Sequence, residues 1–378
     1  LTVAAPHAAF LTALTQIPVL PLGRLTHAQL ASAAAHPSHP LATSGPYHVA
    51  LANDSGLNLT RNTYAVPRPS LPFLRFDFYS TFNAAAAAFT GGGADAMLAT
   101  TPQQRARLMH RQGSVAHGIA TFQFVDLLFN ERVPGLDDPA VRRAIATAIN
   151  RTAIVGGALD GSSGLQQEGA VSQGLAWIAG GAPKEVSSPA VAAELLSQAG
   201  WSVGPDGTRV RGTSALSYTL TVANVAPLPT VATELANQLA QIGVSVRVQQ
   251  VPADKFVAPD VTQHDFEMAL GDWDNGPDPD VSAFWRSNAT PPDGVNVSGA
   301  TPDPFLDQAL DILASATDAQ ARIAAAVAVS HDLAVDTPAV FLYTPVDSYV
   351  VHSSLARTPV PSVGGSEARF ADITSWHH

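Results

Sequence analysis

The chain has 378 residues, which is too long for one small core and fits two lobes of ordinary size. Its formal net charge is -11 with only 20 Lys and Arg residues, so binding to a nucleic-acid backbone, which needs clustered cations, is not expected. The absence of cysteine excludes disulfides, thiolate metal sites and a cysteine nucleophile.

The first third of the chain predicts short helices and a small antiparallel sheet. Turn residues at Asn53 and Asp54 separate two alternating segments, which is typical of a hairpin. The expected elements are a helix from Phe10, a helical piece near Thr26–Ala35, strands at Tyr47–Leu51, Leu57–Thr60 and Leu74–Phe78, and a helix at Asn83–Phe89.

The middle of the chain predicts a buried strand and an α/β unit. The apolar run Phe122–Phe129 reads as a strand, and Pro139 opens an amphipathic helix with Arg142 and Arg143 on its polar face. A helix at Ser188–Ala199 follows. Strand, helix and strand then follow in the order of a right-handed crossover, at Leu216–Val222, Thr230–Gln241 and Val244–Val251.

The last third predicts a strand at Asp265–Leu270, and Asp272–Asp280 follows as a loop rich in Asp, Gly and Pro. Two helices and two strands complete the chain, at Pro304–Ala314, Ala319–Leu333, Ala339–Tyr343 and Tyr349–Val351. No run of 18 or more apolar residues occurs, so no membrane-spanning helix is expected.

A set of fragments follows one order along the chain. They are Thr43–Tyr47, Thr60–Tyr64, Leu128–Asn130, Asp137–Ala144, Ala148–Arg151, Ala193–Trp201, Leu239–Val248, Asp278–Asp280 and Thr337–Phe341. In this order they resemble the peptide- and nickel-type solute-binding proteins of ABC importers. Thr43–Tyr47 is similar to the Gly-Thr-Gly-Pro-Tyr turn of that family, and Thr60–Tyr64 to its Arg-Asn-x-x-Tyr.

The resemblance implies an α/β fold of the periplasmic-binding-protein type (class II, cluster C), with two lobes joined by hinge strands. The implied lobes are residues 1–123 plus 348–378, lacking the family's usual N-terminal portion, and residues 124–347. The implied function is capture of di- or oligopeptides in a cleft between the lobes and delivery to an ABC permease. The implied location is extracytoplasmic, peripheral to the membrane and lipid-anchored, with no cofactor and no catalysis.

In relatives, a strand-to-loop segment of the second lobe pairs with the main chain of the peptide and supplies an Asp for its ammonium group. The matching segment is Gly271–Asp280, which suggests Asp274 as the amine partner and Gly271 and Trp273 as the ligand-facing strand. Without gaps the family's Asp falls on Asn275, and Asp274 fits only if Pro277 is an insertion. The alternative is a loop making its own turn hydrogen bonds.

Two further residues are candidates for the ligand site. Asn296 matches a family Asn that helps to hold a cleft-side loop, with a plain turn residue as the alternative. Phe124 lies on a segment expected to cross between the lobes, where a core role is the alternative.

Other functions have less support. His36 and His39 have useful metal spacing, but Pro37 interrupts them, so no metal site is expected. Neither a Gly-x-Ser-x-Gly elbow nor a His-Glu-x-x-His motif occurs, which disfavours a hydrolase. The remaining alternatives are a binding fold recruited as a sensor or envelope scaffold, and a binder of a nickel chelate or oligosaccharide.

Overall fold

The computed structural model describes residues 7–15, 26, 28, 45–175, 177–178, 186–256, 261, 263–289, 294–297, 303–353, 355 and 361–377. These residues form two units. Unit 1 holds the described residues among 1–12, 120–346 and 363–365, and unit 2 holds those among 13–119, 347–362 and 366–378. The candidate histidines His36 and His39 lie outside the described residues, as does most of the helical piece expected near Thr26–Ala35.

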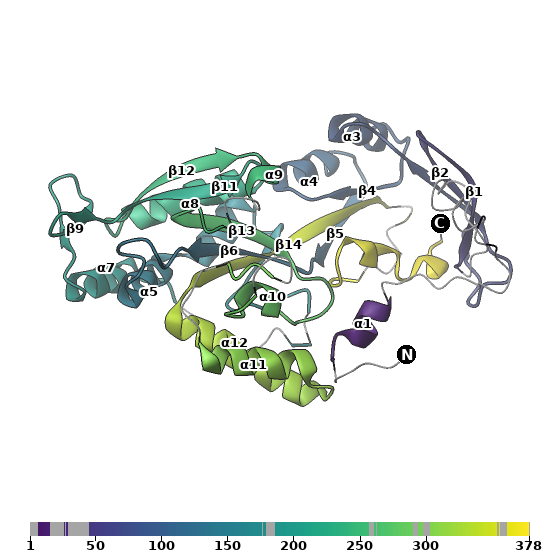
Figure 1. Cartoon of the computed structure of the whole chain (residues 1–378). Coiled ribbons are helices and arrows are strands. Elements are labelled where there is room, and N and C mark those ends of the chain that lie inside the picture. Colours follow the sequence, from purple (N-terminus) through teal and green to yellow (C-terminus); the bar gives the residue numbers. More distant parts are fainter. Residues whose placement is uncertain are drawn as a thin grey trace. The chain divides into compact units, whose positions relative to one another are not determined.

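Unit 1 is built on a mixed sheet with the strand order β12-β11-β13-β6-β14, and β7 also pairs with β14 (Figure 1). The strands β11 and β12 are parallel, as are β11 and β13, whereas β6 runs antiparallel to both β13 and β14. The bounds are β6 Gln123–Phe129, β7 Gly164–Gln166, β11 Ser217–Ala223, β12 Ser245–Val251, β13 Met268–Asp274 and β14 Ala339–His352.

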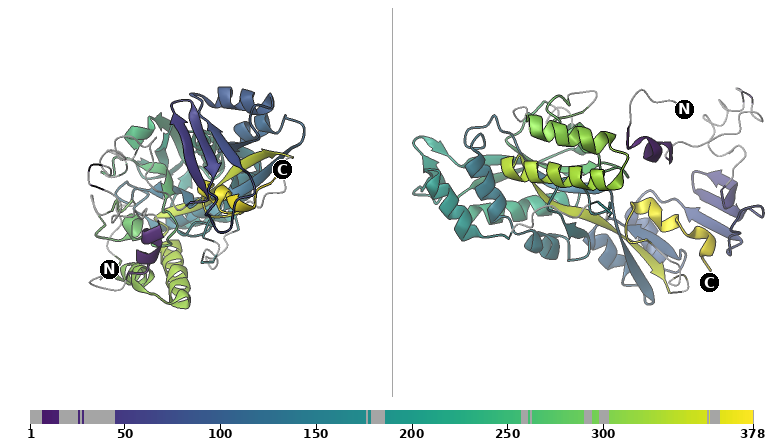
Figure 2. Two further views of the ribbon diagram at one scale, coloured as in Figure 1. Left: turned by 90° about the vertical axis from the view of Figure 1, so that its right-hand side faces the viewer. Right: turned by 90° about the horizontal axis from the view of Figure 1, so that it is seen from below.

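Helices cover this sheet. The helix α8 (Leu228–Ala240) joins β11 to β12 and packs on both strands, so the expected strand-helix-strand unit is confirmed. The helices α11 (Pro304–Ser315) and α12 (Ala319–Asp336) lie side by side along unit 1 (Figure 2). The other helices of unit 1 are α5 Pro139–Ala148, α6 Arg151–Ala153, the π-helix η2 Ile154–Ala158, α7 Pro189–Gln198, α9 Ala253–Lys255 and α10 Ser282–Trp285. A small separate sheet contains β8 Ser202–Val203, β9 Arg209–Arg211 and β10 Ser214–Ala215.

Three of these helices begin where an oxygen-bearing side chain precedes proline. The carboxylate of Asp138 caps α5, the hydroxyl of Ser188 caps α7 and the carboxylate of Asp303 caps α11, and in each case proline is the next residue. A capping oxygen satisfies a backbone N–H of the first turn, and proline costs nothing there because its missing N–H has no partner within the helix.

Unit 2 contains a three-stranded antiparallel sheet in the order β1-β2-β3, and the expected hairpin is confirmed. Asn53 forms the turn, since its Oδ1 accepts hydrogen bonds from the backbone N–H groups of Ser55 and Gly56. The C-terminal part of β14 pairs with β4. The bounds are β1 Tyr47–Asn53, β2 Gly56–Arg61, β3 Phe73–Asp77, α3 Phe82–Thr90, β4 Ala96–Ala99, α4 Pro102–Leu108 and β5 Ser114–Ala120, with 3-10 turns η4 Ser366–Phe370 and η5 Ile373–Ser375. A further helix among the described residues is α1 Phe10–Thr15.

Two expectations about strands are wrong. The strands expected at Ala339–Tyr343 and Tyr349–Val351 are one continuous strand, β14, because its residues pair with β6 and β7 in unit 1 and with β4 further on. Asp272 and Asp274, expected in the loop Asp272–Asp280, belong to β13 together with Gly271 and Trp273, which the resemblance placed in a strand, because β6 continues to pair with all four. In the described part of the chain, no helix is both long and apolar enough to cross a membrane.

The prediction that α5 is amphipathic is wrong about the place of one residue. Arg142, expected on the polar face, is 1% exposed. Its guanidinium donates to the carbonyls of Leu136 and Thr337 and contacts the Asp336 carboxylate at 2.8 Å. A buried cation is tolerated only when its N–H groups are paired, and here it ties α5 to the end of α12.

We therefore predict that Arg142→Met lowers the free energy of unfolding by about 3 kcal/mol, because it leaves buried carbonyls without their donor and the Glu131 carboxyl group, 3.7 Å from the guanidinium, without its cation. Arg143→Met is the matched control, since the neighbouring guanidinium is exposed and donates to the carbonyl of Val335 at 3.1 Å. Urea unfolding followed by circular dichroism measures both. Equal losses in the two variants would contradict a special role for Arg142.

Candidate functional site

The end of β13 has an unpaired edge. The strand β6 pairs with β13 along its whole length, from Met268 to Asp274, whereas β11 pairs only with Met268–Leu270. No described strand therefore lies on the β11 side of Gly271–Asp274. A strand edge of this kind carries free N–H and C=O groups that can pair with another extended chain.

The register decides which residues offer those groups. The backbone N–H of Asn130 donates to the carbonyl of Glu267 at 3.1 Å, which marks one hydrogen-bonded pair of the antiparallel ladder. Such pairs recur at every second residue, so Gly271 and Trp273 point their backbone groups toward β6. The backbone groups of Asp272 and Asp274 point to the free edge.

The same two residues present their carboxylates to solvent. Asp272 and Asp274 are two positions apart, so their side chains leave the same face of the strand, and both residues are exposed. Desolvation of its carboxyl group, and then the charge of Asp274, raise the pKa of Asp272 to about 6, so it is mostly ionised at neutral pH. Asp274 Oδ1 accepts a hydrogen bond from the backbone N–H of Gly276 at 2.8 Å, and neither carboxylate forms an ion pair with a described cation. Two unneutralised carboxylates beside a free strand edge form an acceptor for a cationic group.

The opposite face of β13 is buried. The rings of Trp273 and Phe284 pack with centroids 5.3 Å apart. Phe124 lies edge-on to the Phe284 ring, with centroids 5.7 Å apart. Gly271 leaves room for the indole, because a Cβ there would meet Trp273 Nε1 and Asp126 Oδ1. Trp273 and Phe124 thus belong to the core of unit 1, and their contact with a ligand stays a prediction.

A buried acid lies under this strand. Asp126 is 0% exposed, and its Oδ1 accepts a hydrogen bond from Trp273 Nε1 at 3.0 Å. Its Oδ2 has no partner among the described residues. Burial raises the pKa of Asp126 to about 8, against the smaller lowering effect of the Trp273 hydrogen bond. Asp126 is therefore mostly protonated near neutral pH.

The loop after β13 makes its own turn bonds and is tied down by an ion pair. Asn275 Nδ2 donates to the carbonyl of Asp278 at 2.5 Å. The carboxylate of Asp278 contacts Arg322 of α12 at 2.7 Å, and both side chains are largely buried. The binding roles of Asn275 and Asp274 stay predictions, whereas the turn bonds foreseen as the alternative are present.

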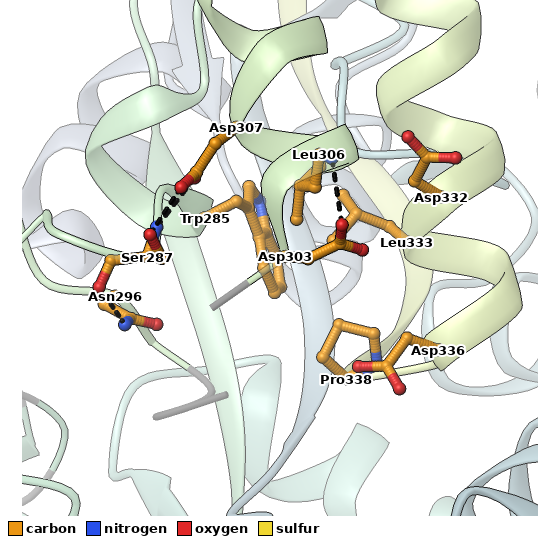
Figure 3. Close-up of a pocket in the computed structure, with 10 residues that line it drawn as sticks. All are labelled: Trp285, Ser287, Asn296, Asp303, Leu306, Asp307, Asp332, Leu333, Asp336 and Pro338. Atoms are coloured by element: carbon orange, nitrogen blue, oxygen red, sulfur yellow. Dashed lines mark hydrogen bonds between the residues drawn. The ribbon is translucent and has the colours of Figure 1, made fainter. Parts of the chain in front are cut away.

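Asn296 lies at a different place, beside a small pocket of about 20 Å³ (Figure 3). Its Nδ2 donates to the carbonyl of Ser287 at 3.1 Å, and its own carbonyl is 2.6 Å from His264 Nε2. The residue thereby holds its loop, but its part in ligand binding stays a prediction. Space of this size holds a water molecule and excludes a peptide. The pocket is lined by Trp285, Ser287, Asn296, Asp303, Leu306, Asp307, Asp332, Leu333, Asp336 and Pro338.

Several structural residues of the site were not singled out from the sequence. The signal for Asp126 is present, because a lone acid interrupts the apolar run Phe122–Phe129. The signal for Asp272 is its alternation with Asp274, which becomes visible only when the segment is read as strand. Nothing local marks Arg322 as the partner of Asp278, since 44 residues separate them. Within the described residues no group of three His, Cys, Asp or Glu could hold a metal ion.

We predict that the free energy of unfolding of Asp126→Asn increases relative to that of the wild type as the pH rises. The folded-state pKa of about 8 lies above the ordinary aspartate value of 3.8, so between these two pH values the folded state holds a proton that the unfolded state has lost. The wild type therefore loses stability relative to the variant at roughly 1.4 kcal/mol per pH unit in this window. The asparagine Oδ1 still accepts from Trp273. Thermal unfolding at pH 4 and pH 8 checks this, and a difference in Tm that does not depend on pH would contradict it.

We also predict that Arg322→Ala lowers the free energy of unfolding by about 3 kcal/mol, because it leaves the largely buried Asp278 carboxylate without a cation. The double variant with Asp278→Ala should recover part of that loss. The exposed pair Arg75–Asp77 is the control, since surface ion pairs contribute at most about 1 kcal/mol. A double-mutant cycle with a coupling energy near zero would show that the two buried side chains act independently.

Comparison with known proteins supports one family. The family model described as bacterial extracellular solute-binding proteins, family 5 middle, matches residues 1–294. A putative ABC transporter peptide-binding protein of Brucella ovis is 26% identical over 331 residues, which cover 84% of this chain and 60% of the relative. Protein XP55 of Streptomyces lividans is 28% identical over 209 residues, which cover 54% of this chain and 37% of the relative. The chain thus spans less than two thirds of the length of these curated relatives.

Solved structures confirm the expected fold. The substrate-binding protein CtaP of Listeria monocytogenes has a TM-score of 0.81 at 18% identity, with 100% of this chain and 75% of that chain covered. NikZ of Campylobacter jejuni, in complex with Ni(L-His), has a TM-score of 0.74 at 20% identity, with 100% and 76% covered. AppA of Bacillus subtilis, in complex with a nonapeptide, has a TM-score of 0.67 at 21% identity, with 99% and 75% covered. With its family model matched over residues 1–294 and its α/β fold shared with these proteins, the chain belongs to the bacterial extracellular solute-binding proteins of family 5.

Proposed function

We propose that this protein captures di- or oligopeptides and delivers them to an ABC import permease. The observation that carries the proposal is the unpaired edge of Gly271–Asp274 with the two exposed carboxylates of Asp272 and Asp274. Relatives described as peptide-binding proteins, and a structural neighbour that holds a nonapeptide, support it.

The edge suits the main chain of a peptide. An extended peptide laid beside β13 would exchange hydrogen bonds with the backbone of Asp272 and Asp274, and these bonds do not depend on the peptide's side chains. Selection by main chain allows many sequences to bind, which is what an importer of mixed peptides requires. This refines the expectation from the sequence, which assigned the ligand-facing strand to Gly271 and Trp273.

The carboxylates suit the peptide's ammonium group. Asp274 uses one oxygen for the turn at Gly276 and keeps its second oxygen for a ligand. A charge-assisted bond from an ammonium group contributes roughly 1.5–3 kcal/mol and fixes the register of the peptide on the strand. Asp272, two residues earlier on the same face, adds negative potential, and neither acid has a described cation that would compete.

The remaining parts of the proposal concern the whole protein. Units 1 and 2 would be the two lobes, with hinge bending where the chain passes between them, at the end of β5 and within β14. The family is extracellular, so the partner would be a membrane permease met outside the cytoplasm, with a lipid anchor holding the binding protein at the membrane. Binding and release suffice for this role, and no catalytic step is proposed.

We predict that Asp274→Ala weakens binding of trialanine about 10- to 100-fold and leaves binding of N-acetyl-trialanine nearly unchanged, because only the free amine uses the carboxylate. Asp272→Ala should have a smaller effect of the same kind. Asp206→Ala in the turn between β8 and β9 is the control, since that exposed carboxylate lies in a different sheet. Isothermal titration calorimetry of the full-length protein measures all of these affinities.

Two outcomes would count against the proposal. If neither trialanine nor a mixed peptide library binds the full-length protein, peptide capture is contradicted, and a role as a sensor or envelope scaffold is favoured instead. If both forms of trialanine lose affinity equally in Asp274→Ala, then Asp274 is not the amine partner, although peptide capture itself would stand.

A further inference from the structure

One face of the unit 1 sheet carries a row of side chains that crosses three neighbouring strands, β13, β6 and β14 (Figure 1). Asp272 of β13 pairs with Val125 of β6, and Val125 pairs with Tyr343 of β14. Residues directly opposite each other in adjacent strands project to the same face of a sheet. Asp274, two residues beyond Asp272, shares this face. The two acids and Tyr343 therefore belong to one surface.

Tyr343 brings to this surface a hydroxyl group that the protein itself does not use. The residue is 1% exposed, and its ring lies against Gly164, where a Cβ would meet it. Its hydroxyl forms no hydrogen bond with a described residue. Unlike Asp126 Oδ2, the hydroxyl oxygen is not completely enclosed, so a ligand can reach it. A largely buried hydroxyl without a partner is unfavourable, which indicates a partner from outside the chain.

The hydroxyl of Tyr343 also senses the charge of Asp272. Burial, and then the charge of Asp272, raise the pKa of Tyr343, which keeps the hydroxyl protonated at neutral pH. The carboxylate of Asp272 in turn forms no hydrogen bond or ion pair with a described residue. A carboxylate and a phenolic oxygen thus lie near each other, and both have lone pairs that can accept hydrogen bonds.

The neighbouring positions on this face add acceptors and no cation. The strand β6 contributes Gln123, opposite Asp274, and β7 contributes Gln166, opposite Tyr343. The side-chain N–H of Gln166 donates to Thr152 Oγ1 at 2.9 Å, so its Oε1 remains as a further acceptor. None of these positions holds Lys, Arg or His, and the surface therefore suits a cationic group that carries several donors.

We infer that Asp272 and Tyr343 form a subsite for a basic side chain of the bound peptide, so that arginine-containing peptides are the preferred ligands. The inference rests on the proposed function, in which the peptide lies along the free edge of β13 with its ammonium group at Asp274. A peptide residue directly opposite Asp272 has its side chain on the same face, with the two Cβ atoms about 5 Å apart. A guanidinium group has five N–H donors in one plane and no acceptor, so it can bond to the carboxylate and the phenolic oxygen together.

The register of the strand decides which residue of the peptide is basic. Asp272 and Asp274 are two residues apart, so the peptide residue beside Asp272 is the third when the first binds Asp274. The side chain of the second peptide residue points to the opposite face. Arginine at the third position should therefore increase affinity, and arginine at the second position should not.

Isothermal titration calorimetry of the full-length protein tests the subsite with four tetrapeptides. These are tetra-alanine, Ala-Ala-Arg-Ala, Ala-Ala-citrulline-Ala and Ala-Arg-Ala-Ala. Citrulline has the shape of arginine without its charge, so the comparison isolates the charge. The peptide with arginine in third place should bind about tenfold more tightly than its citrulline analogue. The peptide with arginine in second place should bind no more tightly than tetra-alanine.

Two variants assign this preference to the two side chains. Asp272→Asn should abolish the preference for arginine over citrulline, because it removes the charge and keeps the shape. Tyr343→Phe should reduce the preference to about threefold, and it breaks no described hydrogen bond of the protein. Asp206→Asn is the matched control, since this exposed acid lies in the turn between β8 and β9 and should keep the full preference. Circular dichroism confirms that each variant is folded.

The outcomes separate this inference from the proposed function. Equal affinity for the arginine and citrulline peptides, in a protein that binds tetra-alanine, would overturn the inference and leave peptide capture standing. A tenfold preference that persists in Asp272→Asn would also overturn it, because another acid would then bind the guanidinium. If none of the four peptides binds, the proposed function is contradicted and the inference with it.

Discussion

The pairing of β13 with β6 is the constraint on which the candidate site depends. Its register turns Trp273 and Gly271 toward the core and turns the side chains of Asp272 and Asp274 toward solvent. The same register points the backbone groups of the two acids to the edge that β11 leaves free. A shift of one residue would exchange the two faces, burying the carboxylates and exposing the indole. One ladder therefore fixes both the hydrophobic support of the site and its polar surface.

Buried charged groups hold the elements around that ladder. Only 13% of the residues are charged, yet Arg142 and the Arg322–Asp278 pair lie almost entirely inside unit 1. Arg142 joins α5 to the end of α12, and Arg322 joins α12 to the loop that follows β13. In a low-dielectric interior these guanidinium groups are stable only with all their partners in place, so they specify one arrangement of helix and loop.

The two units differ in how completely their sheets are paired. In unit 1 the edge left open is short and ends in carboxylates, which suits reversible association with a small extended ligand. In unit 2 residues of β3 and β4 line one groove of mixed polarity, and the Nε1–H of Trp376 beside it has no acceptor among the described residues.

The sequence by itself determined the family, most helices and most strands. Local signals suffice for these features: Pro139 after Asp138 starts α5, Asn53 turns the hairpin, and the apolar run before Asn130 forms β6. Only the tertiary structure decided that β13 continues through Asp274, that Arg142 is buried and that Arg322 reaches Asp278. Each of these depends on partners far away in the chain, because a strand's length is set by its neighbour and a buried charge by the groups that neutralise it.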